Sequence, residues 1–468
     1  MRGKTWKGRL AVFAVLVLVL AVMAGCSGRS GGSGGSGGSP SSPAASPPPA
    51  SSQAPAGGGE TGQTARPFEG RSITFVIANH PWGEAIKPLL PEFEEATGMT
   101  VNVDSFFEDQ LTQKLTVQFA SGSSTPDVFM YRPLQEGKLF FKNGWLEALD
   151  GYVSGSTDYD FADFSKAAVG STTVDGKLTG IPIITEQEIL YYRKDVLAEK
   201  GIPVPKTLTE LVDAARQLHD PANEFYGFVA RGQLSPLVTQ VSSFIYSEGG
   251  DFITDGKASI NTPEALRGMS IYAELLREYG PPGVLNMSWP QAIGVFAQGK
   301  VAFYTDASSI YQNATDPEKS NIPDKVGFAM FPAGSAGSRP YNVTSWGLAI
   351  NAKSQNKDAA WALIEWATSK EIVLKTQKMG NPGARVSVWN NPESTSSYPP
   401  ELVEVIREST KGGVDHDRPT VISVGEAREV VGEIVQRMIT GASETEIQTI
   451  ADEANKKLQE IIDRDAQR

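Results

Sequence analysis

One stretch, residues 181–195, restricts most strongly what this chain can fold into. It reads IPIITEQEILYYRKD, in which Thr185, Glu186 and Gln187 separate two apolar runs. Polar groups inside a buried run cost free energy unless a partner satisfies them, and that partner is either a ligand or a local hydrogen bond. We interpret the stretch as the first crossing between two lobes. Glu186 is then expected to face the cleft, and Arg193 to open a helix.

The size and charge of the chain exclude several classes of protein. A length of 468 residues is too great for one hydrophobic core and predicts at least two domains. The net charge of −12 argues against a nucleic-acid partner, for which a basic face is expected. The sequence has no phosphate-binding loop, zinc-ligand spacing or Cys/His pair, so we expect neither a cofactor nor a metal. Asp415, His416 and Asp417 are adjacent and are interpreted as an exposed turn.

The amino-terminal segment has the order of an export signal. Four basic residues precede an apolar run from Leu10 to Ala24, which is too short to span a membrane. The next residues, Met23 to Cys26, resemble a bacterial lipobox, in which the cysteine is acylated and becomes the mature amino terminus. The sequence therefore predicts a lipoprotein signal peptide over residues 1–25 and lipidation at Cys26, the single cysteine of the chain.

A tether is expected to follow the anchored cysteine. Residues 26–67 consist almost entirely of Gly, Ser, Pro and Ala. Such a composition cannot bury apolar surface and is typical of flexible linkers. Folded structure is therefore expected to begin near Phe68.

The first part of the folded region alternates strands and helices. Strand-like runs of β-branched and aromatic residues lie between segments with apolar residues at helical spacing. The expected order is strand 72–78, helix 89–97, strand 100–103, helix 108–120 and strand 126–131. An order of βαβαβ predicts a parallel sheet with helices on both faces, and hence an α/β fold.

The same pattern resumes after the crossing. Thr207 and Glu210 form a capping box at the head of a helix that runs to Leu218. Further helices are expected after Pro263 and over 289–298, 358–368 and the carboxyl terminus, and strands over 225–229, 301–306 and 346–351. We place the second crossing near the strand 301–306.

Five segments together resemble a known family. They read PEFEEATGMTVNV, QKLTVQFASGSSTPDVF, ILYYRKDVL, FAQGKVAFYTDAS and NKDAAWALIEWATS. In this order, behind a lipobox, they make residues 72–468 similar to the extracellular solute-binding proteins of ABC importers, in the carbohydrate-binding branch that includes the maltose-binding protein. Polyol and sugar binders of this family are also similar in WPQAIGVFAQGKVAFYTDAS and in GNPGARVSVWNNPE.

The resemblance implies a two-lobed periplasmic-binding-protein fold of the type II kind. Each lobe is a sheet flanked by helices, and hinge crossings join the two lobes, which close over a ligand. By the family's connectivity, the amino-terminal lobe comprises residues 68–182 and 307–366. The carboxyl-terminal lobe comprises residues 183–306 and 367–468.

The resemblance also implies a set of polar ligand contacts. Glu186 aligns with a hinge glutamate that hydrogen-bonds sugar hydroxyls in the maltose-binding member. Tyr131 takes the place of a cleft aromatic, and Asp127 lies in the strand that leads to it. Asp306 lies where the second crossing leaves its lobe, and Arg385 follows the third. Structural alternatives remain open, because Asp127 can cap backbone amides and Arg385 can bridge the lobes.

Aromatic residues complete the expected site. Sugars offer hydroxyls to charged hydrogen-bonding groups and pack their C–H faces on aromatic rings. Trp82, Tyr131, Trp289 and Trp346 all fall in loops or at strand ends that we expect to face the cleft, with core packing as the alternative. Carboxylates and aromatics together favour a neutral polyhydroxylated ligand over an anion.

The function implied by the resemblance is transport. The protein is expected to capture a sugar, oligosaccharide or polyol and to deliver it to an ABC transporter permease, as a monomer on the extracellular face of the cytoplasmic membrane, or in the periplasm of a diderm. Two alternatives stay open. Glu186 with Asp306 or Asp127 could act as the two carboxylates of a secreted glycoside hydrolase, or the binding protein could feed a sensor instead of an importer.

Overall fold

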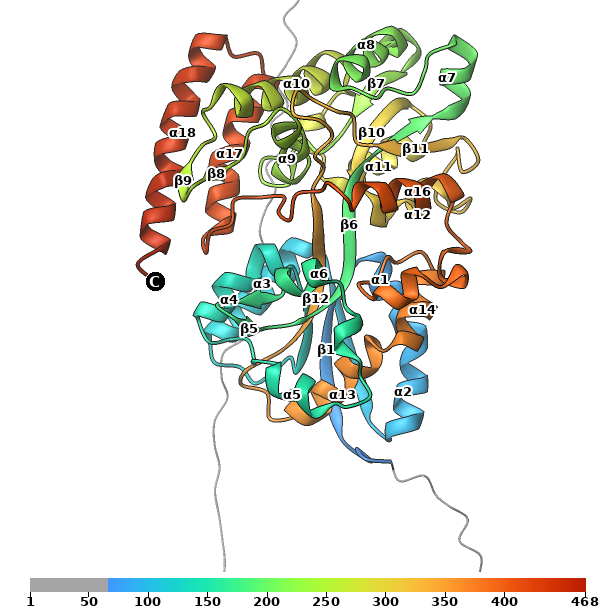
Figure 1. The fold of residues 1–468 in the computed structure, drawn as a ribbon, viewed down its shortest axis with the longest axis vertical. Helices are drawn as coiled ribbons and strands as arrows, with labels where there is room; N and C mark the ends of the chain where they lie inside the picture. Colours follow the sequence, from blue (N-terminus) through green and yellow to red (C-terminus); the bar gives the residue numbers. More distant parts are fainter. Residues whose placement is uncertain (1–65) are drawn as a thin grey trace, which may run out of the picture. The chain divides into compact units, whose positions relative to one another are not determined.

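The structure, a computed structural model, describes residues 66–468, so the expected signal peptide, tether and lipidated Cys26 lie outside the described residues. The described chain forms two lobes, drawn one above the other in Figure 1. The elements of the first lobe are β1 (Ser72–Ala78), α1 (Pro81–Ile86), α2 (Leu90–Thr97), β2 (Thr100–Phe106), α3 (Glu108–Ala120), β3 (Val128–Tyr131), α4 (Lys138–Lys142), α5 (Asp150–Gly155), α6 (Lys166–Ser171), β4 (Thr173–Val174), β5 (Lys177–Leu178), α13 (Lys357–Ala367), α14 (Lys370–Lys378) and α15 (Val386–Trp389).

The opening βαβαβ unit is confirmed. Strand β1 pairs in parallel with β2 on one side and with β3 on the other. Helix α2 ends at Gly98, whose φ of 75° is the left-handed conformation that glycine adopts without steric cost. Helix α3 buries Leu111, Leu115 and Phe119, the apolar stripe expected from the sequence.

The second lobe is also a sheet covered by helices. Strand β10 pairs with β7 in parallel, and β6 lies on the other side of β10. Thr207 and Glu210 make both hydrogen bonds of the capping box at the head of α8. The elements are α7 (Lys194–Lys200), α8 (Leu208–Leu218), β7 (Tyr226–Val229), α9 (Leu237–Ser247), β8 (Ile253–Thr254), β9 (Lys257–Ala258), α10 (Pro263–Tyr279), α11 (Trp289–Ala297), β10 (Val301–Ala307), α12 (Gln312–Thr315), β11 (Val326–Met330), α16 (Pro400–Ser409), α17 (Val424–Ile439) and α18 (Glu444–Asp465).

Two strands connect the lobes, as Figure 1 shows. Strand β6 (Ile181–Arg193) is continuous, and its residues up to Gln187 pair with β12 (Asn342–Ile350). From Glu188 onward β6 pairs with β10 and β11 in the second lobe. The first crossing therefore lies where the sequence places it, although the polar residues do not interrupt the strand.

The second crossing was expected near residues 301–306, and this expectation is wrong. Strand β10 stays inside the sheet of the second lobe, between β6 and β7. The chain continues through β11, also in that sheet, and returns to the first lobe along β12. A strand that crosses between the lobes and a strand that stays inside one sheet have similar apolar sequences. Only their long-range pairing distinguishes the two.

The apolar cores correct the expected lobe boundaries in two places. Ile310 and Phe328 pack in a cluster with β10 and α11, and hence in the second lobe. Ile372 and Ala384 pack in the cluster that contains β1, β3 and α13, and hence in the first. Segments 307–330 and 370–384 therefore lie in the lobes opposite to those implied by the family's connectivity.

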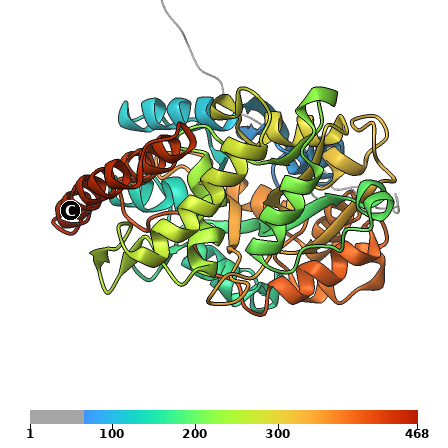
Figure 2. The ribbon, with the colours of Figure 1, turned by 90° about the horizontal axis from the view of Figure 1, so that it is seen from above.

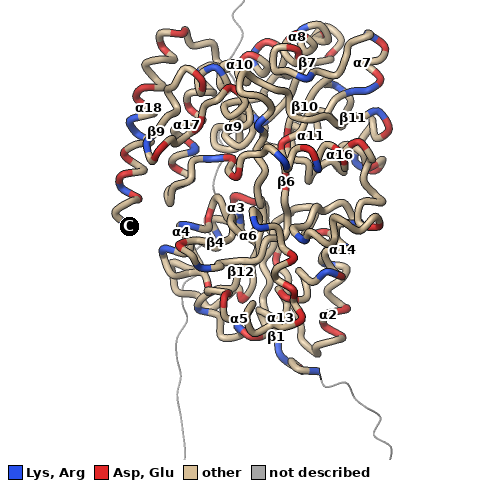
Figure 3. The backbone as a smooth tube through the Cα atoms, viewed as in Figure 1, with Lys and Arg blue, Asp and Glu red and all other residues tan. Residues whose placement is uncertain are grey.

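The carboxyl-terminal helix lies at the outside of the second lobe, and charged residues of both signs cover both lobes (Figures 1 and 3). Helix α18 runs along one flank of the second lobe, away from the orange segment that contains α16, in both views (Figures 1 and 2). Basic and acidic residues are interspersed over both lobes (Figure 3). Within residues 66–468, no helix combines the length and apolar character that crossing a bilayer requires.

Candidate ligand-binding site

A cavity of about 640 Å³ lies between the two lobes. Several of its walls are loops that leave the carboxyl ends of strands, the usual place for ligands in α/β sheets. His80 follows β1, Arg132 follows β3 and Arg231 follows β7. Of the site residues expected from the sequence, the structure places Glu186, Trp289 and Trp346 at this cavity.

Glu186 lies on β6 at the point where the strand passes between the lobes. It is only 9% exposed, and Ser309 donates a hydrogen bond of 2.6 Å to its Oε2. Burial disfavours the charged carboxylate and raises its pKa to about 7, against the opposing effect of the Ser309 hydrogen bond. Glu186 is thus a hydrogen-bonding group whose charge state changes near neutral pH.

The two tryptophans come from opposite lobes. Trp346 on β12 is almost fully buried, with the His80 ring 5.7 Å and the Arg132 guanidinium 5.9 Å from its own ring. Trp289 is the first residue of α11 and is half-buried. Its Nε1 donates to Oε1 of Glu108, 3.1 Å away across the cavity. Trp289 offers apolar ring surface beside hydrogen-bonding groups, whereas Trp346 is 3% exposed and packs in the first-lobe core as well as lining the cavity.

His80 is neutral in this environment. Burial lowers its pKa to about 4. Its Nδ1 accepts a hydrogen bond from the backbone N–H of Trp82, so it caps helix α1 as well as contacting Trp346.

Asp306 reaches the cavity only through a partner. It is completely buried and pairs with both Nε and a terminal nitrogen of Arg231, at 3.0 and 2.6 Å. Tyr304 and Gln240 donate two further hydrogen bonds to the same carboxylate. Asp306 therefore fixes the guanidinium of Arg231, and it is Arg231 that lines the cavity.

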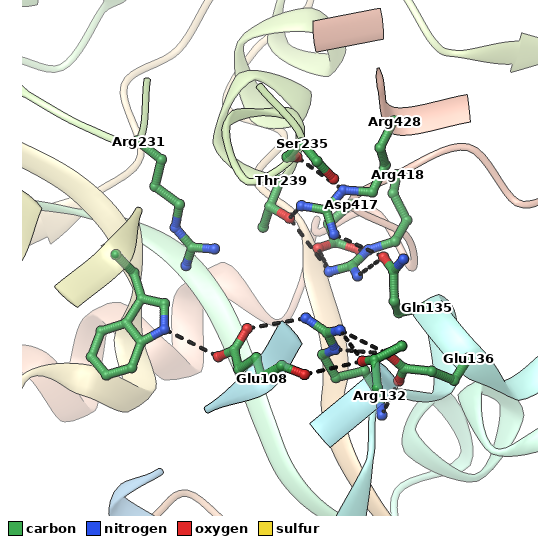
Figure 4. A network of polar contacts seen from close by, with 12 residues as sticks. Glu108, Arg132, Gln135, Glu136, Arg231, Ser235, Thr239, Asp417, Arg418 and Arg428 are labelled. Carbon is green, nitrogen blue, oxygen red and sulfur yellow. Dashed lines mark hydrogen bonds and ion pairs between the residues drawn. The ribbon is translucent and has the colours of Figure 1, made fainter. Parts of the chain in front are cut away.

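A second ion-paired arginine lines the first-lobe wall. Arg132 contacts Glu136 at 2.7 Å and Glu108 at 3.1 Å, and Thr112 accepts from the same guanidinium at 2.8 Å. In Figure 4, Glu108, Arg132 and Glu136 lie below a further cluster, in which side chains of the second lobe meet Gln135 of the first. In that cluster, Arg418 and Arg428 both donate to Oε1 of Gln135, each at 2.8 Å.

Two of the expected aromatics lie in the core of the first lobe instead. Trp82 is 2% exposed and packs edge-on against Phe75. Tyr131 is 1% exposed, contacts the Thr179 hydroxyl and lies against Gly347. Neither side chain lines the cavity. A strand end brings a residue near the cleft, but its side chain can point to either face of the sheet.

The two remaining polar candidates have structural roles. Asp127 accepts from Thr74 N–H at 2.9 Å and from Ser354 Oγ at 2.6 Å, so it ties loops of the first lobe. Arg385 is fully buried over the rings of Tyr159 and Phe164 and donates to backbone carbonyls within the first lobe. It contacts no residue of the second lobe in the described hydrogen bonds, so it does not bridge the lobes.

Neither pair of carboxylates expected for a hydrolase comes together at the cavity. The hydrolase alternative needs two carboxyl groups that face one substrate bond. Of the pairs considered from the sequence, Asp306 is committed to Arg231, and Asp127 lies outside the cavity. Among residues 66–468, no cluster of three or more His, Cys, Asp or Glu side chains has the placement of a metal site.

Comparison with known proteins identifies the family. The profile of the family described as bacterial extracellular solute-binding protein matches residues 78–373, more than half of the chain. The chain belongs to this family. The resemblance seen in its sequence is therefore confirmed, and the two-lobed α/β fold is that of its structural neighbours.

Several relatives of the solute-binding protein have named ligands. An erythritol/L-threitol-binding protein of Mycolicibacterium smegmatis is 29% identical, over 67% of this chain and 70% of the relative. A mannitol-binding protein of Pseudomonas aeruginosa is 30% identical, over 67% of this chain and 72% of the relative. A solved ABC transporter solute-binding protein of Agrobacterium radiobacter K84 in complex with ribitol has a TM-score of 0.77 and 29% identity, covering 84% of this chain and 99% of that one.

Sequence reasoning missed the arginines of the solute-binding protein. Arg132 and Arg231 each follow the end of a strand by one or two residues, the same signal that drew attention to the aromatic residues. Arg418 and Arg428 are different, because the chain segment after α16 has no strand to mark its place. Only the packing of α17 against the second lobe brings them to the cavity.

Proposed function

We propose that this solute-binding protein captures a sugar or polyol in the cavity between its lobes and delivers it to the permease of an ABC importer. The observation that carries the proposal is the lining of the cavity, where two tryptophans lie among side chains that donate and accept hydrogen bonds, contributed by both lobes. Relatives that bind erythritol, mannitol and ribitol support the same class of ligand.

Each proposed contact has a matching chemistry. Trp289 and Trp346 offer ring surface on which the C–H faces of a sugar or polyol pack. Glu186 accepts from a hydroxyl when ionised and donates to one when protonated. The guanidiniums of Arg132 and Arg231 are held rigid by their carboxylate partners, so they present fixed donors to ligand oxygens.

Capture follows from the connection of the lobes. Strands β6 and β12 join them, and the cavity lies between them. A ligand that contacts both lobes stabilises the closed arrangement by the free energy of those contacts. We propose lobe boundaries at these strands, with residues 68–187 and 342–391 in the first lobe and 188–341 and 398–468 in the second.

A calorimetric and thermal-shift screen tests the function. Sugars, sugar alcohols and short oligosaccharides are titrated into the purified protein, and a binder raises the melting temperature because it stabilises only the folded state. We expect stoichiometric binding of at least one sugar alcohol or sugar, recovered unchanged after long incubation. Failure of every such compound to bind contradicts the proposed ligand class, and slow turnover to a shorter sugar supports the hydrolase instead.

We also propose that a lipid on Cys26 holds the protein at the extracellular face of the cytoplasmic membrane. The family is extracellular, and the lipobox-like residues before Cys26 support the anchor. In cells, Cys26→Ala should release the protein from the membrane fraction or leave it as unprocessed precursor. Ser27→Ala serves as a control that keeps the anchor. A Cys26→Ala protein that is correctly cleaved and still sediments with membranes contradicts the proposal.

A further inference from the structure

A buried arginine at the cavity has no acidic partner. Arg428 on α17 is 5% exposed and lines the cavity. It donates to Ser235 O at 3.0 Å, to Gln135 Oε1 at 2.8 Å and to Thr239 Oγ1 at 3.2 Å, and all three acceptors are neutral. In the described part of the chain, no Asp or Glu forms an ion pair with it. A buried charge without a counter-charge is costly, so this position calls for an explanation.

The carboxylate beside Arg428, that of Asp417, is already paired with the neighbouring arginine, Arg418. Arg418 is 9% exposed and pairs through two nitrogens with Asp417. Burial raises the pKa of Asp417, but the Arg418 ion pair, the charge of Arg428 and a hydrogen bond with Thr239 outweigh burial and lower this pKa to about 2. The second arginine nonetheless shares two acceptors with Arg428, namely Gln135 and Thr239 (Figure 4). Two guanidiniums thus meet one carboxylate, which leaves one positive charge in excess.

Neighbouring arginines repel the Arg428 charge, although Arg132 and Arg231 each have carboxylate partners of their own. Burial lowers the pKa of Arg428 well below its usual value, and repulsion from Arg418, Arg132 and Arg231 acts in the same direction. Arginine nevertheless stays protonated in proteins, so the Arg428 guanidinium remains charged. Its burial without a paired carboxylate costs electrostatic free energy, and a nearby anion reduces that cost. Asp417 offsets only part of it.

Donors remain for an anion at this end of the cavity. A guanidinium has five N–H donors, and the described contacts of Arg428 use three of them. Carboxylates are recognised by arginine through short, charge-assisted hydrogen bonds. Oε1 of Gln135 accepts hydrogen bonds from both arginines. A ligand oxygen beside it would accept from the same two guanidiniums.

We propose that Arg428, with Arg418, Gln135 and Thr239, forms a subsite for a single carboxylate group of the ligand, so that the preferred ligand is a sugar acid or an acidic polyol. The proposal rests on the proposed function and narrows its ligand class, and it replaces the neutral ligand expected from the sequence with an acidic one. One excess positive charge matches one carboxylate, whereas the dianion of a phosphate ester would leave a negative charge unpaired. The hydroxylated remainder of the ligand lies toward Trp289 and Glu186.

Matched pairs of ligands test the subsite on the intact protein. Ribitol is compared with ribonate, and glucitol with gluconate, by isothermal titration calorimetry at two ionic strengths. We expect each acid to bind at least tenfold more tightly than its alcohol, because hydrogen bonds to charged groups contribute more than neutral ones. The advantage of the acid should shrink as salt increases, while the affinity for the alcohol stays nearly constant.

Variants locate the effect. Arg428→Gln should remove the preference for the acid while the alcohol still binds, and Arg428→Lys should keep part of it. Arg437→Gln is the matched control, because Arg437 lies on the same helix but is exposed. If Arg428→Gln fails to fold, the comparison of acid with alcohol on the wild-type protein alone decides the question.

The outcomes separate this inference from the proposed function. Alcohols that bind as tightly as the acids overturn the carboxylate subsite and leave the proposed function intact. If no sugar alcohol, sugar acid or sugar binds, the proposed function is wrong, and so is the subsite. Glucitol 6-phosphate that binds more tightly than gluconate overturns the carboxylate assignment.

Discussion

At the scale of single residues, the site is built from carboxylates whose charges are used in different ways. Asp306 accepts hydrogen bonds from Arg231, Tyr304 and Gln240 and from the backbone N–H of the next residue, so its role is to hold Arg231 in place. Glu186 has one described partner, Ser309, and faces the cavity. The difference in their partners, and not in residue type, makes one a positioning group and the other a candidate ligand contact.

Glu186 should make the stability of the protein depend on pH. Its pKa is raised to about 7 by burial, so between pH 4.5 and 7 the folded state holds a proton that the unfolded state has lost. Stability therefore falls as pH rises through this range, by at most about 3 kcal/mol for this group. Chemical denaturation of wild type and Glu186→Gln at pH 5 and 8 measures it.

The variant isolates Glu186 from other titrating groups. Burial also raises the pKa of Glu188, which contributes a loss of stability of the same sign in both proteins. The difference between wild type and Glu186→Gln removes that shared contribution. Equal pH dependence of the two proteins would show that Glu186 is ionised throughout.

Trp289→Ala should weaken ligand binding more than it weakens the fold. The ring is half-buried at the start of α11, and its loss removes a stacking surface and the hydrogen bond to Glu108. We expect a loss of about 1–3 kcal/mol of binding free energy by calorimetry, with little change in melting temperature.

A second tryptophan gives the opposite expectation. Trp366 packs against Phe93 in the first lobe and does not line the cavity. Trp366→Ala should lower the melting temperature and leave ligand affinity nearly unchanged. Equal losses of stability in both variants, without a selective effect on binding, would place Trp289 in the core.

The residue scale also shows where sequence prediction stops. Trp346 and Tyr131 belong to neighbouring strands, and local sequence marks both as aromatic residues near the cleft. Trp346 lines the cavity and Tyr131 packs inside the lobe, because side chains of a strand point to alternate faces. Pattern identifies the residues that reach a strand end, but the register and twist of the sheet decide which of them face the ligand.

At the scale of elements, close packing under the crossing strands depends on two glycines. Tyr131 lies against Gly180, just before β6, and against Gly347 in β12. A Cβ at Gly180 would approach the Tyr131 ring to 2.6 Å and the carbonyl oxygen of Leu348 to 2.9 Å. At Gly347 the nearest atom to an added Cβ would be in the Tyr131 ring at 3.0 Å, so Gly180 is the more restricted of the two positions.

Gly180→Ala should therefore destabilise the protein. Overpacking of a well-filled core costs about 1–3 kcal/mol, and the measurement is the free energy of unfolding in urea. Gly170→Ala in α6 is the control, because no atom lies within 4 Å of its added methyl group. The control should be neutral or slightly stabilising, since alanine favours a helix over glycine. A stable Gly180→Ala protein would mean that Tyr131 can shift.

Elements with a strong local signal are the ones that sequence predicted well. Helix α3 has the predicted bounds, and α8 begins with the predicted capping box. The strand pairing was harder to foresee. Strands β10, β11 and β12 are all largely buried, and no local feature of their sequences indicates that two of them stay in the second lobe while the third returns to the first.

At the scale of the whole molecule, three sets of hydrogen bonds between described residues join the lobes apart from those of the connecting strands. Gln135 accepts from Arg418 and Arg428, Trp289 donates to Glu108, and the Lys138 ammonium donates to the Thr420 carbonyl at 2.8 Å. These contacts exist only while the lobes are together. They add to the contacts of a ligand in stabilising the closed arrangement.

Gln135→Ala should weaken closure without unfolding either lobe. The substitution removes an acceptor shared by two buried guanidiniums, which costs about 1–3 kcal/mol when the donors are left unsatisfied. The cost is avoided when the lobes separate and water reaches the arginines. Ligand affinity should therefore fall roughly 5- to 150-fold by calorimetry, and small-angle scattering should show a larger radius of gyration at a given ligand concentration.

Lys138→Ala provides the contrast for this prediction. It also removes a contact between the lobes, but the lysine is exposed, so water replaces the lost hydrogen bond and binding should change by less than about threefold. If Gln135→Ala instead lowers the melting temperature of the ligand-free protein by as much as it weakens binding, Gln135 stabilises its own lobe. The link between lobe closure and the arginine pair would then be wrong, because the loss would not depend on whether the lobes meet.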